Sequence, residues 1–186
     1  MTHYSPGGPI ILAEHDAAWP DEFRREAGAI SVALSDVTTA VHHIGSTAIS
    51  GLVAKPVLDM LLVVPQLGLL DARSDRLAAL GYEARGEFGI PGRRFFSRTI
   101  PQGIRTHQIH AYARGAEAVQ RHLDFRDYLR AHPSVAIEYG RLKTRLAASF
   151  GADVEGYATA KTAFVREVER LAAAWRAARP GPDSAV

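Results

Sequence analysis

A single carboxylate lies inside the most apolar stretch of the sequence. Asp59 belongs to the segment Val57–Val64, in which every other residue is apolar. A carboxylate in such surroundings is costly unless it is paired, hydrogen-bonded or bound to a cation. Two interpretations are therefore open. Asp59 is either a structural residue bonded to backbone amides or to an arginine, or a functional residue of a catalytic or cation-binding site.

A small polar turn precedes this carboxylate. Gly45, Ser46 and Thr47 follow a short apolar segment, and Asp59 comes 12 residues after Thr47. The backbone N–H groups and the two hydroxyls of such a turn can hold phosphate oxygens. A glycine next to Ser or Thr is more often a plain turn or a helix cap. The turn therefore indicates a phosphate site only in combination with Asp59.

Two histidines of an expected strand, His107 and His110, are candidate metal ligands together with Asp59. They are three residues apart, so they face opposite ways on a regular strand unless a bulge turns one of them. His110 shares its face with Thr106 and Gln108, and it is the candidate catalytic partner of Asp59 if that face looks toward it. A His with one Asp suits Zn²⁺, Mn²⁺ or acid–base chemistry better than Mg²⁺. The alternative is that both histidines are structural.

Basic residues supply the positive charge that a phosphate site needs. Arg94 and Arg98 are expected on one face of a strand, because they are four residues apart. Lys161 interrupts the apolar stripe of the last helix, where a lysine more often extends along its neighbours to water than into a cleft. The candidates for phosphate binding, besides the turn, are Lys55, Arg94, Arg98, Arg105 and Lys161.

These residues need a scaffold, and the pattern predicts an α+β fold with a mixed sheet and a helical C-terminal portion. Val57–Val64 is apolar on both faces, so we expect it inside the sheet and covered on both sides. Expected strands are Ile10–Ala13, Val41–Ile44, Val57–Val64, Tyr82–Arg85, Arg93–Ile100 and Ile104–Arg114. Expected helices are Trp19–Leu34, Leu67–Leu80, Ala116–His132, Pro133–Phe150 and Asp153–Ala178.

The composition limits the classes of protein that fit. The 186 residues are 47% hydrophobic and 23% charged, which excludes a disordered chain and favours one domain over 1–186 with flexible ends at 1–9 and 179–186. The absence of cysteine excludes disulfides, thiolate nucleophiles and cysteine-bound zinc. No apolar run approaches the roughly 20 residues of a membrane span, and no signal peptide opens the sequence, so we expect a cytoplasmic protein without a membrane partner.

The segment around the turn resembles known nucleotide-handling proteins. Ile44-Gly45-Ser46 followed by Asp59 is similar to the signature of the polymerase-β-like nucleotidyltransferases. The longer segment Val41–Val64 more closely resembles the GrpB family, whose pattern runs His-Ile-Gly-Ser-Thr, Gly-Leu, Lys-Pro, Asp. This pattern also places a histidine at His43. Further similar positions are Trp19-Pro20, Phe23, Arg105-Thr106-His107, His110, 125–130, Tyr139, Leu142-Lys143, Tyr157, Lys161 and Phe164.

The resemblance covers nearly the whole chain and implies a nucleotidyltransferase-like fold. Such transferases hold two Mg²⁺ ions with two or three carboxylates. The residue two positions after Asp59 shares its face of the strand, and here it is Leu61. We therefore expect binding of a nucleotide or other phosphorylated small molecule with a divalent cation (Mg²⁺ or Mn²⁺, or else Zn²⁺). Whether a nucleotidyl group is transferred stays open, with His110 as a replacement for the third carboxylate.

Other functions also fit the sequence. One is a non-catalytic sensing or scaffold module with a degenerate metal site, and another is a metal-dependent hydrolase that uses Asp59 with His107 or His110. Nucleic acid is not an expected partner. Arg93-Arg94-Phe95-Phe96 mixes charge with aromatic rings, but the net charge is only +2 and no broad basic tract is present. The sequence leaves the oligomeric state open.

Overall fold

The computed structural model describes residues 8–179, so the flexible ends expected at 1–9 and 179–186 lie almost wholly outside the described residues. Within this part of the chain, one mixed sheet of five strands has the order β1-β2-β5-β4-β3. β2 and β5 are parallel, and the other neighbours are antiparallel. The strands are β1 (Ala40–Ile44), β2 (Leu58–Val64), β3 (Glu83–Ala84), β4 (Arg94–Thr99) and β5 (Arg105–Ala113).

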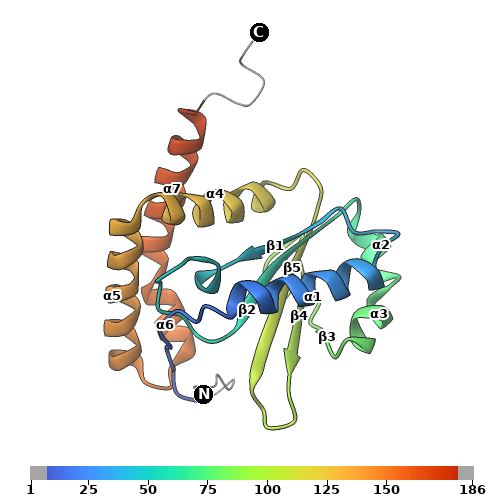
Figure 1. Cartoon of the computed structure of the whole chain (residues 1–186), viewed down its shortest axis with the longest axis horizontal. Helices are drawn as coiled ribbons and strands as arrows, with labels where there is room; N and C mark the ends of the chain where they lie inside the picture. Colours follow the sequence, from blue (N-terminus) through green and yellow to red (C-terminus); the bar gives the residue numbers. More distant parts are fainter. Residues whose placement is uncertain (1–7, 180–186) are drawn as a thin grey trace.

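The helices cover the sheet and extend beyond one end of it (Figure 1). They are α1 (Trp19–Ala33), the 3₁₀ helix η1 (Ser46–Ala48), α2 (Leu67–Asp71), α3 (Ser74–Ala79), α4 (Glu117–Ala131), α5 (Pro133–Phe150), α6 (Val154–Ala160) and α7 (Thr162–Ala177). Helix α1 crosses one face of the sheet, while α5, α6 and α7 gather at its end. This arrangement confirms the expected α+β class. None of the helices in residues 8–179 has the length and apolar character to cross a membrane.

Strand β2 alternates between two environments, as side chains on a strand must. Met60, Leu62 and Val64 face the apolar cluster that includes Ile30 of α1, and all four side chains are completely buried. Asp59, Leu61 and Val63 face the opposite side. Their neighbours there are Gln108, His110 and Tyr112 of β5, the residues that pair with them in the parallel register. β2 thus lies inside the sheet and is covered on both faces, as predicted.

A second apolar cluster belongs to the C-terminal helices. Tyr128 and Leu129 of α4, Tyr139 of α5 and Val168 and Ala172 of α7 pack together in it. Ile49 and Leu52, which follow η1, belong to the same cluster. The turn that follows β1 is therefore fixed to the helical portion as well as to the sheet.

Three expected elements differ from the structure. The helix expected at Leu67–Leu80 is broken into α2 and α3, because Arg73 leaves the helical conformation (φ −127°, ψ 16°) and pairs with Asp36. The helix expected at Asp153–Ala178 is divided into α6 and α7 at Lys161. Ile10–Ala13 is not a strand of the sheet, since its contribution is an isolated bridge between Ala13 and Ala54.

Candidate functional site

A cavity of about 210 Å³ lies between the carboxylate of β2, the turn after β1 and the helices α5 to α7. We call it the lysine pocket. It is lined by Ser46, Thr47, Lys55, Val57, Asp59, Gln108, Tyr139, Lys143, Tyr157 and Lys161. Five of the residues expected at a phosphate site therefore line one cavity: Ser46, Thr47, Lys55, Asp59 and Lys161.

Gly45 brings the turn against the carboxylate. Its backbone (φ 69°, ψ −172°) lies in a region that is essentially restricted to glycine. A Cβ atom at this position would lie 2.5 Å from Oδ2 of Asp59. The missing side chain therefore allows the backbone to pass directly over Asp59, and Ser46 and Thr47 follow at the wall of the cavity.

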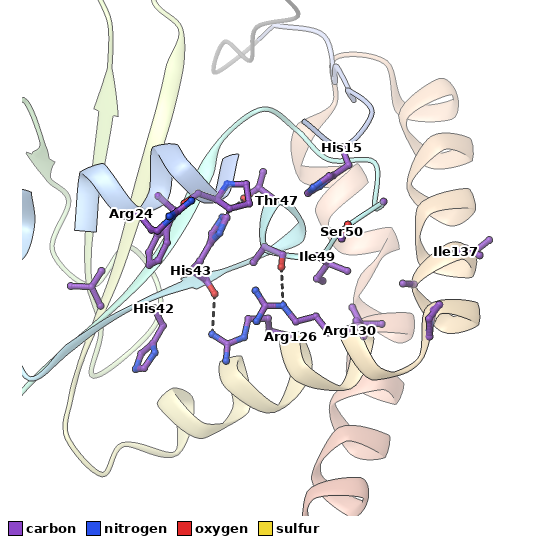
Figure 2. Close-up of a pocket in the computed structure, with 18 residues that line it drawn as sticks. His15, Arg24, His42, His43, Thr47, Ile49, Ser50, Arg126, Arg130 and Ile137 are labelled. Carbon is purple, nitrogen blue, oxygen red and sulfur yellow. Dashed lines mark hydrogen bonds between the residues drawn. The ribbon is translucent and has the colours of Figure 1, made fainter. Parts of the chain in front are cut away.

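The turn is held from its other side by groups that do not reach the lysine pocket. The Nε2 atom of His43 is 2.9 Å from Oγ1 of Thr47, and its ring stacks on Phe23 of α1. Burial lowers the pKa of His43 to about 4, so the ring is neutral near pH 7. From α4, Arg126 donates to the carbonyl of His43 at 3.1 Å, and Arg130 donates to the carbonyl of Ala48 at 2.9 Å (Figure 2). His43, expected near the site, thus positions Thr47.

Lys143 is the most buried lysine of the cavity, with 3% of its surface exposed. Its Nζ atom donates to Oγ of Ser46 at 2.8 Å and to the carbonyl of Val53, and lies 4.6 Å from the centre of the Tyr139 ring. Burial, followed by the charge of Lys161, lowers the pKa of Lys143 to about 7. The amine is therefore about half-protonated near neutral pH.

Lys161 and Lys55 lie against the same aromatic ring. Their Nζ atoms are 4.4 Å and 4.9 Å from the centre of the Tyr157 ring. Burial and the charge of Lys55 lower the pKa of Lys161 to about 8. The pKa of Lys55 is lowered by burial and by the charge of Arg105, while Asp59 opposes this shift. The amines thus disfavour one another's charge, and an anion in the cavity would relieve that repulsion.

His110 lies beside Asp59, because the two residues are on the same face of the sheet. Its Nε2 atom is 3.5 Å from Oδ1 of Asp59, and its Nδ1 atom is 3.4 Å from Nη1 of Arg93. A guanidinium can only donate hydrogen bonds, so Nδ1 accepts and the proton belongs on Nε2, directed at the carboxylate. With its proton on Nε2, His110 would donate to Asp59 rather than ligate a cation.

Three candidate residues lie on the opposite face of the sheet, toward α1. Arg94 donates to Asp71 at 2.7 Å. Arg98 donates to Glu26 at 2.8 Å, and its Nη2 atom is 2.8 Å from Nδ1 of His107. The structure therefore does not bring Arg94, Arg98 or His107 into the lysine pocket. The reason is the alternation along β4 and β5, with no bulge between His107 and His110 to turn either ring.

Arg105 lies close to the lysine pocket but is not part of its lining. It begins β5 and does not line the cavity, but its charge is close enough to lower the pKa of Lys55. Its Nε atom is buried and has no hydrogen-bond partner among residues 8–179. Arg105 therefore adds positive potential near the pocket without lining it.

An apolar residue occupies the position of the second carboxylate that the resemblance implies. Leu61 is completely buried on the same face as Asp59 and packs with Ile44, Val63 and Tyr112 beneath α4. In the described part of the chain, no three His, Cys, Asp or Glu side chains are grouped to hold a metal ion. One carboxylate among three lysines is a poor donor set for two divalent cations. The residues present thus do not fit a two-ion centre.

Sequence reasoning did not assign five lining residues to the site: Val57, Gln108, Tyr139, Lys143 and Tyr157. A signal was available for three of them. Lys143 is four residues after Tyr139 and Lys161 is four residues after Tyr157, which places each lysine beside a tyrosine on one helical face. The first pair lies on the helix expected at 133–150 and the second on the helix expected at 153–178.

Comparison with known proteins identifies related sequences and structures. A family model described as GrpB protein matches residues 9–171. The UPF0157 protein YqkA of Bacillus subtilis is 35% identical over 99% of this chain, which spans 53% of that protein's length. The crystal structure of conserved protein GrpB from Enterococcus faecalis is similar with a TM-score of 0.83 and 37% identity, covering 89% of this chain and 99% of that one.

A more distant likeness concerns the fold alone. A crystal structure of the Cid1 poly(U) polymerase with MgGTP bound has a TM-score of 0.50 and 14% identity. The match covers 73% of this chain and 44% of that chain. The sheet and its helices thus have a counterpart in a nucleotidyltransferase, and no residue of the lysine pocket is assigned from it.

Proposed function

The chain belongs to the GrpB family and has a nucleotidyltransferase-like fold, and on this premise we propose that it binds a nucleotide or another phosphorylated small molecule, with the phosphate groups in the lysine pocket. The observation that carries the proposal is the convergence of Lys55, Lys143 and Lys161 on one small cavity. Its volume of about 210 Å³ is below the roughly 300–1,000 Å³ of pockets that enclose a whole drug-sized ligand. It suits the phosphate end of a molecule whose remainder lies outside.

The charge of the lysines favours a phosphate over a neutral ligand. Charge-assisted hydrogen bonds from ammonium groups to phosphate oxygens are about twice as strong as neutral ones. Burial strengthens them further, because the effective dielectric constant is lower than in water. The hydroxyls of Ser46 and Thr47 add neutral donors at the same wall. A bound phosphate also restores full protonation of Lys143 and Lys161, whose pKa values burial lowers.

Asp59 needs a separate role, because a carboxylate repels a phosphate. Asp59 is the one site carboxylate that we expect to hold a cation, and a single Mg²⁺ or Mn²⁺ ion there would take its other ligands from phosphate oxygens and water. The residues of the pocket do not supply a two-ion centre, so the proposal is binding and includes no transfer step. A sensing module fits this arrangement, whereas the hydrolase alternative loses His107, which lies on the other face.

A thermal-shift screen with isothermal titration tests the proposal. Wild-type protein is measured with inorganic pyrophosphate, nucleoside triphosphates, coenzyme A precursors and sugar phosphates, each with and without Mg²⁺, Mn²⁺ or Zn²⁺. A ligand at 100 times its dissociation constant stabilises the protein by about 2.7 kcal/mol. We expect at least one phosphorylated compound to bind and its dephosphorylated form not to bind. A flat response to the whole panel would overturn the proposal.

Matched variants locate the binding. Lys143→Met and Lys161→Met remove positive charge from the pocket and should each weaken binding at least tenfold. Arg94→Gln removes a positive charge from the opposite face and should leave binding unchanged. Equal losses in all three variants would show that only the overall charge matters, which contradicts the proposed site. Asp59→Asn tests the role of the cation by itself, since this variant should abolish any dependence of ligand affinity on the divalent ion.

A further inference from the structure

A second and larger cavity lies on the other side of the turn. Its volume is about 870 Å³, within the range of pockets that enclose small molecules. It is bounded by the start of α1, by β1 and η1, and by the junction of α4 and α5 (Figure 2). We call it the arginine pocket. It shares Thr47 with the lysine pocket and otherwise has its own lining residues.

Arginines are the charged side chains that line this cavity. Among the described residues, its lining includes Arg24, Arg126 and Arg130, the neutral ring of His43, and no carboxylate. Arg24 is already paired with Asp21, so Arg126 and Arg130 are the arginines that matter for a ligand. Arg126 pairs with Asp127 at 2.7 Å, whereas Arg130 approaches the same carboxylate only to 3.7 Å. Asp127 therefore compensates the pair of arginines only in part, and the cavity attracts anions.

Arg130 has hydrogen-bonding capacity to spare for a ligand. Its Nε atom donates to the carbonyl of Ala48, which fixes the plane of the guanidinium. A guanidinium has five N–H donors, so its Nη groups remain for an acceptor in the cavity. Burial and the charge of Arg126 lower the pKa of Arg130, and an anion would relieve this repulsion. A fixed guanidinium of this kind suits a carboxylate or another flat or tetrahedral oxyanion.

The remaining wall is apolar and open. Ile137 of α5 lines the cavity and has 54% of its surface exposed, so it offers apolar surface to an occupant. Phe23, Val41, Leu129 and Ala136 extend this wall. Covering such surface yields about 25 cal/mol for each Å² removed from water. The cavity therefore offers a cationic wall and an apolar wall to the same occupant.

We propose that the arginine pocket binds a small amphiphilic anion, with its oxyanion head at Arg126 and Arg130 and its apolar body against Ile137 and Phe23. This ligand differs from the phosphorylated molecule assigned to the lysine pocket, because the two cavities present different chemistry. The lysine pocket is smaller and has a single aliphatic lining residue, Val57. The arginine pocket has room and apolar surface for a hydrocarbon or aromatic body.

Isothermal titration with a matched pair of probes tests this inference. Decanoate and decyltrimethylammonium carry the same hydrocarbon chain and opposite charge, and each is used below its micelle-forming concentration. Decanoate should bind saturably with one site per chain, at least tenfold more tightly than the cationic probe. Equal binding of the two probes would contradict the role of the arginines. An absence of saturable decanoate binding would overturn the proposal altogether.

Variants decide whether the binding occurs in this cavity. Ile137→Asp changes an exposed side chain and introduces a negative charge into the apolar wall, so it should weaken decanoate binding at least tenfold without unfolding the protein. Ile90→Asp is the matched control, since Ile90 is 40% exposed and does not line the cavity. Arg130→Gln should also weaken binding. Unchanged affinity in Ile137→Asp would overturn the proposal.

Lys161→Met keeps the two proposals separable. This variant should lose the phosphorylated ligand and keep decanoate, because Lys161 lines only the lysine pocket. If decanoate binding fell together with phosphate binding, both probes would occupy one site and the arginine pocket would not be a separate one.

Discussion

The two faces of strands β2 and β5 have opposite characters, although they are built from alternate residues of the same segments. The face toward α1 carries Met60, Leu62 and Ile109, all completely buried in the main apolar cluster. The other face carries Asp59 and Gln108 at the lysine pocket. The other face thus combines the polar groups of the lysine pocket with a smaller apolar cluster around Leu61, whereas the named residues of the α1 face serve packing.

The largest test of this division is Leu61→Asp. Leu61 shares the site face but lies in an apolar cluster beneath α4, so the new carboxylate would be buried, with His42 and His110 as its cross-strand neighbours. We expect a loss of about 3–5 kcal/mol in the free energy of unfolding, the usual cost of an uncompensated buried charge. Urea denaturation measures this loss. A stable variant with a newly gained affinity for Mn²⁺ would instead show that Leu61 merely replaces a metal ligand.

Leu62→Ala makes the matched change on the α1 face. A buried leucine replaced by alanine costs about 2–5 kcal/mol, through lost burial and a residual cavity. Below its melting temperature the variant should bind a phosphorylated ligand of the lysine pocket with the affinity of the wild type. Urea denaturation and titration of the same preparation measure both quantities. A tenfold loss of affinity would show that the two faces are not separable.

Gly45→Ala tests the close approach between the turn and Asp59. The backbone strain alone costs about 1–3 kcal/mol, and the new Cβ atom must also displace the carboxylate. We therefore expect loss of ligand binding in addition to reduced stability. Gly103→Ala is the control, because Gly103 has φ +75° and no neighbouring atom within 4 Å of its Cβ position. Equal effects on ligand affinity in both variants would contradict the role given to Gly45.

The last test concerns the pH dependence that Lys143 confers. Its pKa is about 7 in the folded protein and near 10.5, the ordinary value of a lysine, when the chain is unfolded. Between these values the unfolded chain binds more protons, so stability rises with pH from about 7 to 10.5 and is level below 7. Lys143→Met should reduce this rise. Ligand affinity should follow the opposite trend in the wild type, falling above pH 7 as the amine loses its proton.

Chemical denaturation at a series of pH values checks the first trend, and titration with a nucleoside triphosphate checks the second. The triphosphate is suitable because its own charge changes little above pH 7 (phosphate monoesters have a second pKa of about 6). Identical pH profiles of stability in Lys143→Met and the wild type would show that Lys143 is not the responsible group.

Much of the fold could be predicted from the sequence, because apolar periodicity reports burial directly. The apolar run around Asp59 predicted an internal strand, and the turn at Gly45 was expected beside it. The register between strands could not be predicted, so the face of Arg98 and His107 relative to Asp59 was unknown. The role of Lys143 was not predicted either. Its spacing from Tyr139 was a local signal, but its approach to the turn depends on how α5 packs, which the sequence does not give.

Thr47 lines both cavities. The turn around it is held by His43 on the side of the arginine pocket and by Lys143 on the side of the lysine pocket. A shared wall has a thermodynamic consequence when each cavity has an occupant. If one occupant displaces the segment 45–48, the free energy of that displacement changes the affinity of the other cavity for its own ligand. Reciprocity then requires that each ligand change the affinity of the other by the same factor. Because Thr47 belongs to both cavities, the occupancy of one cavity then depends on the occupancy of the other.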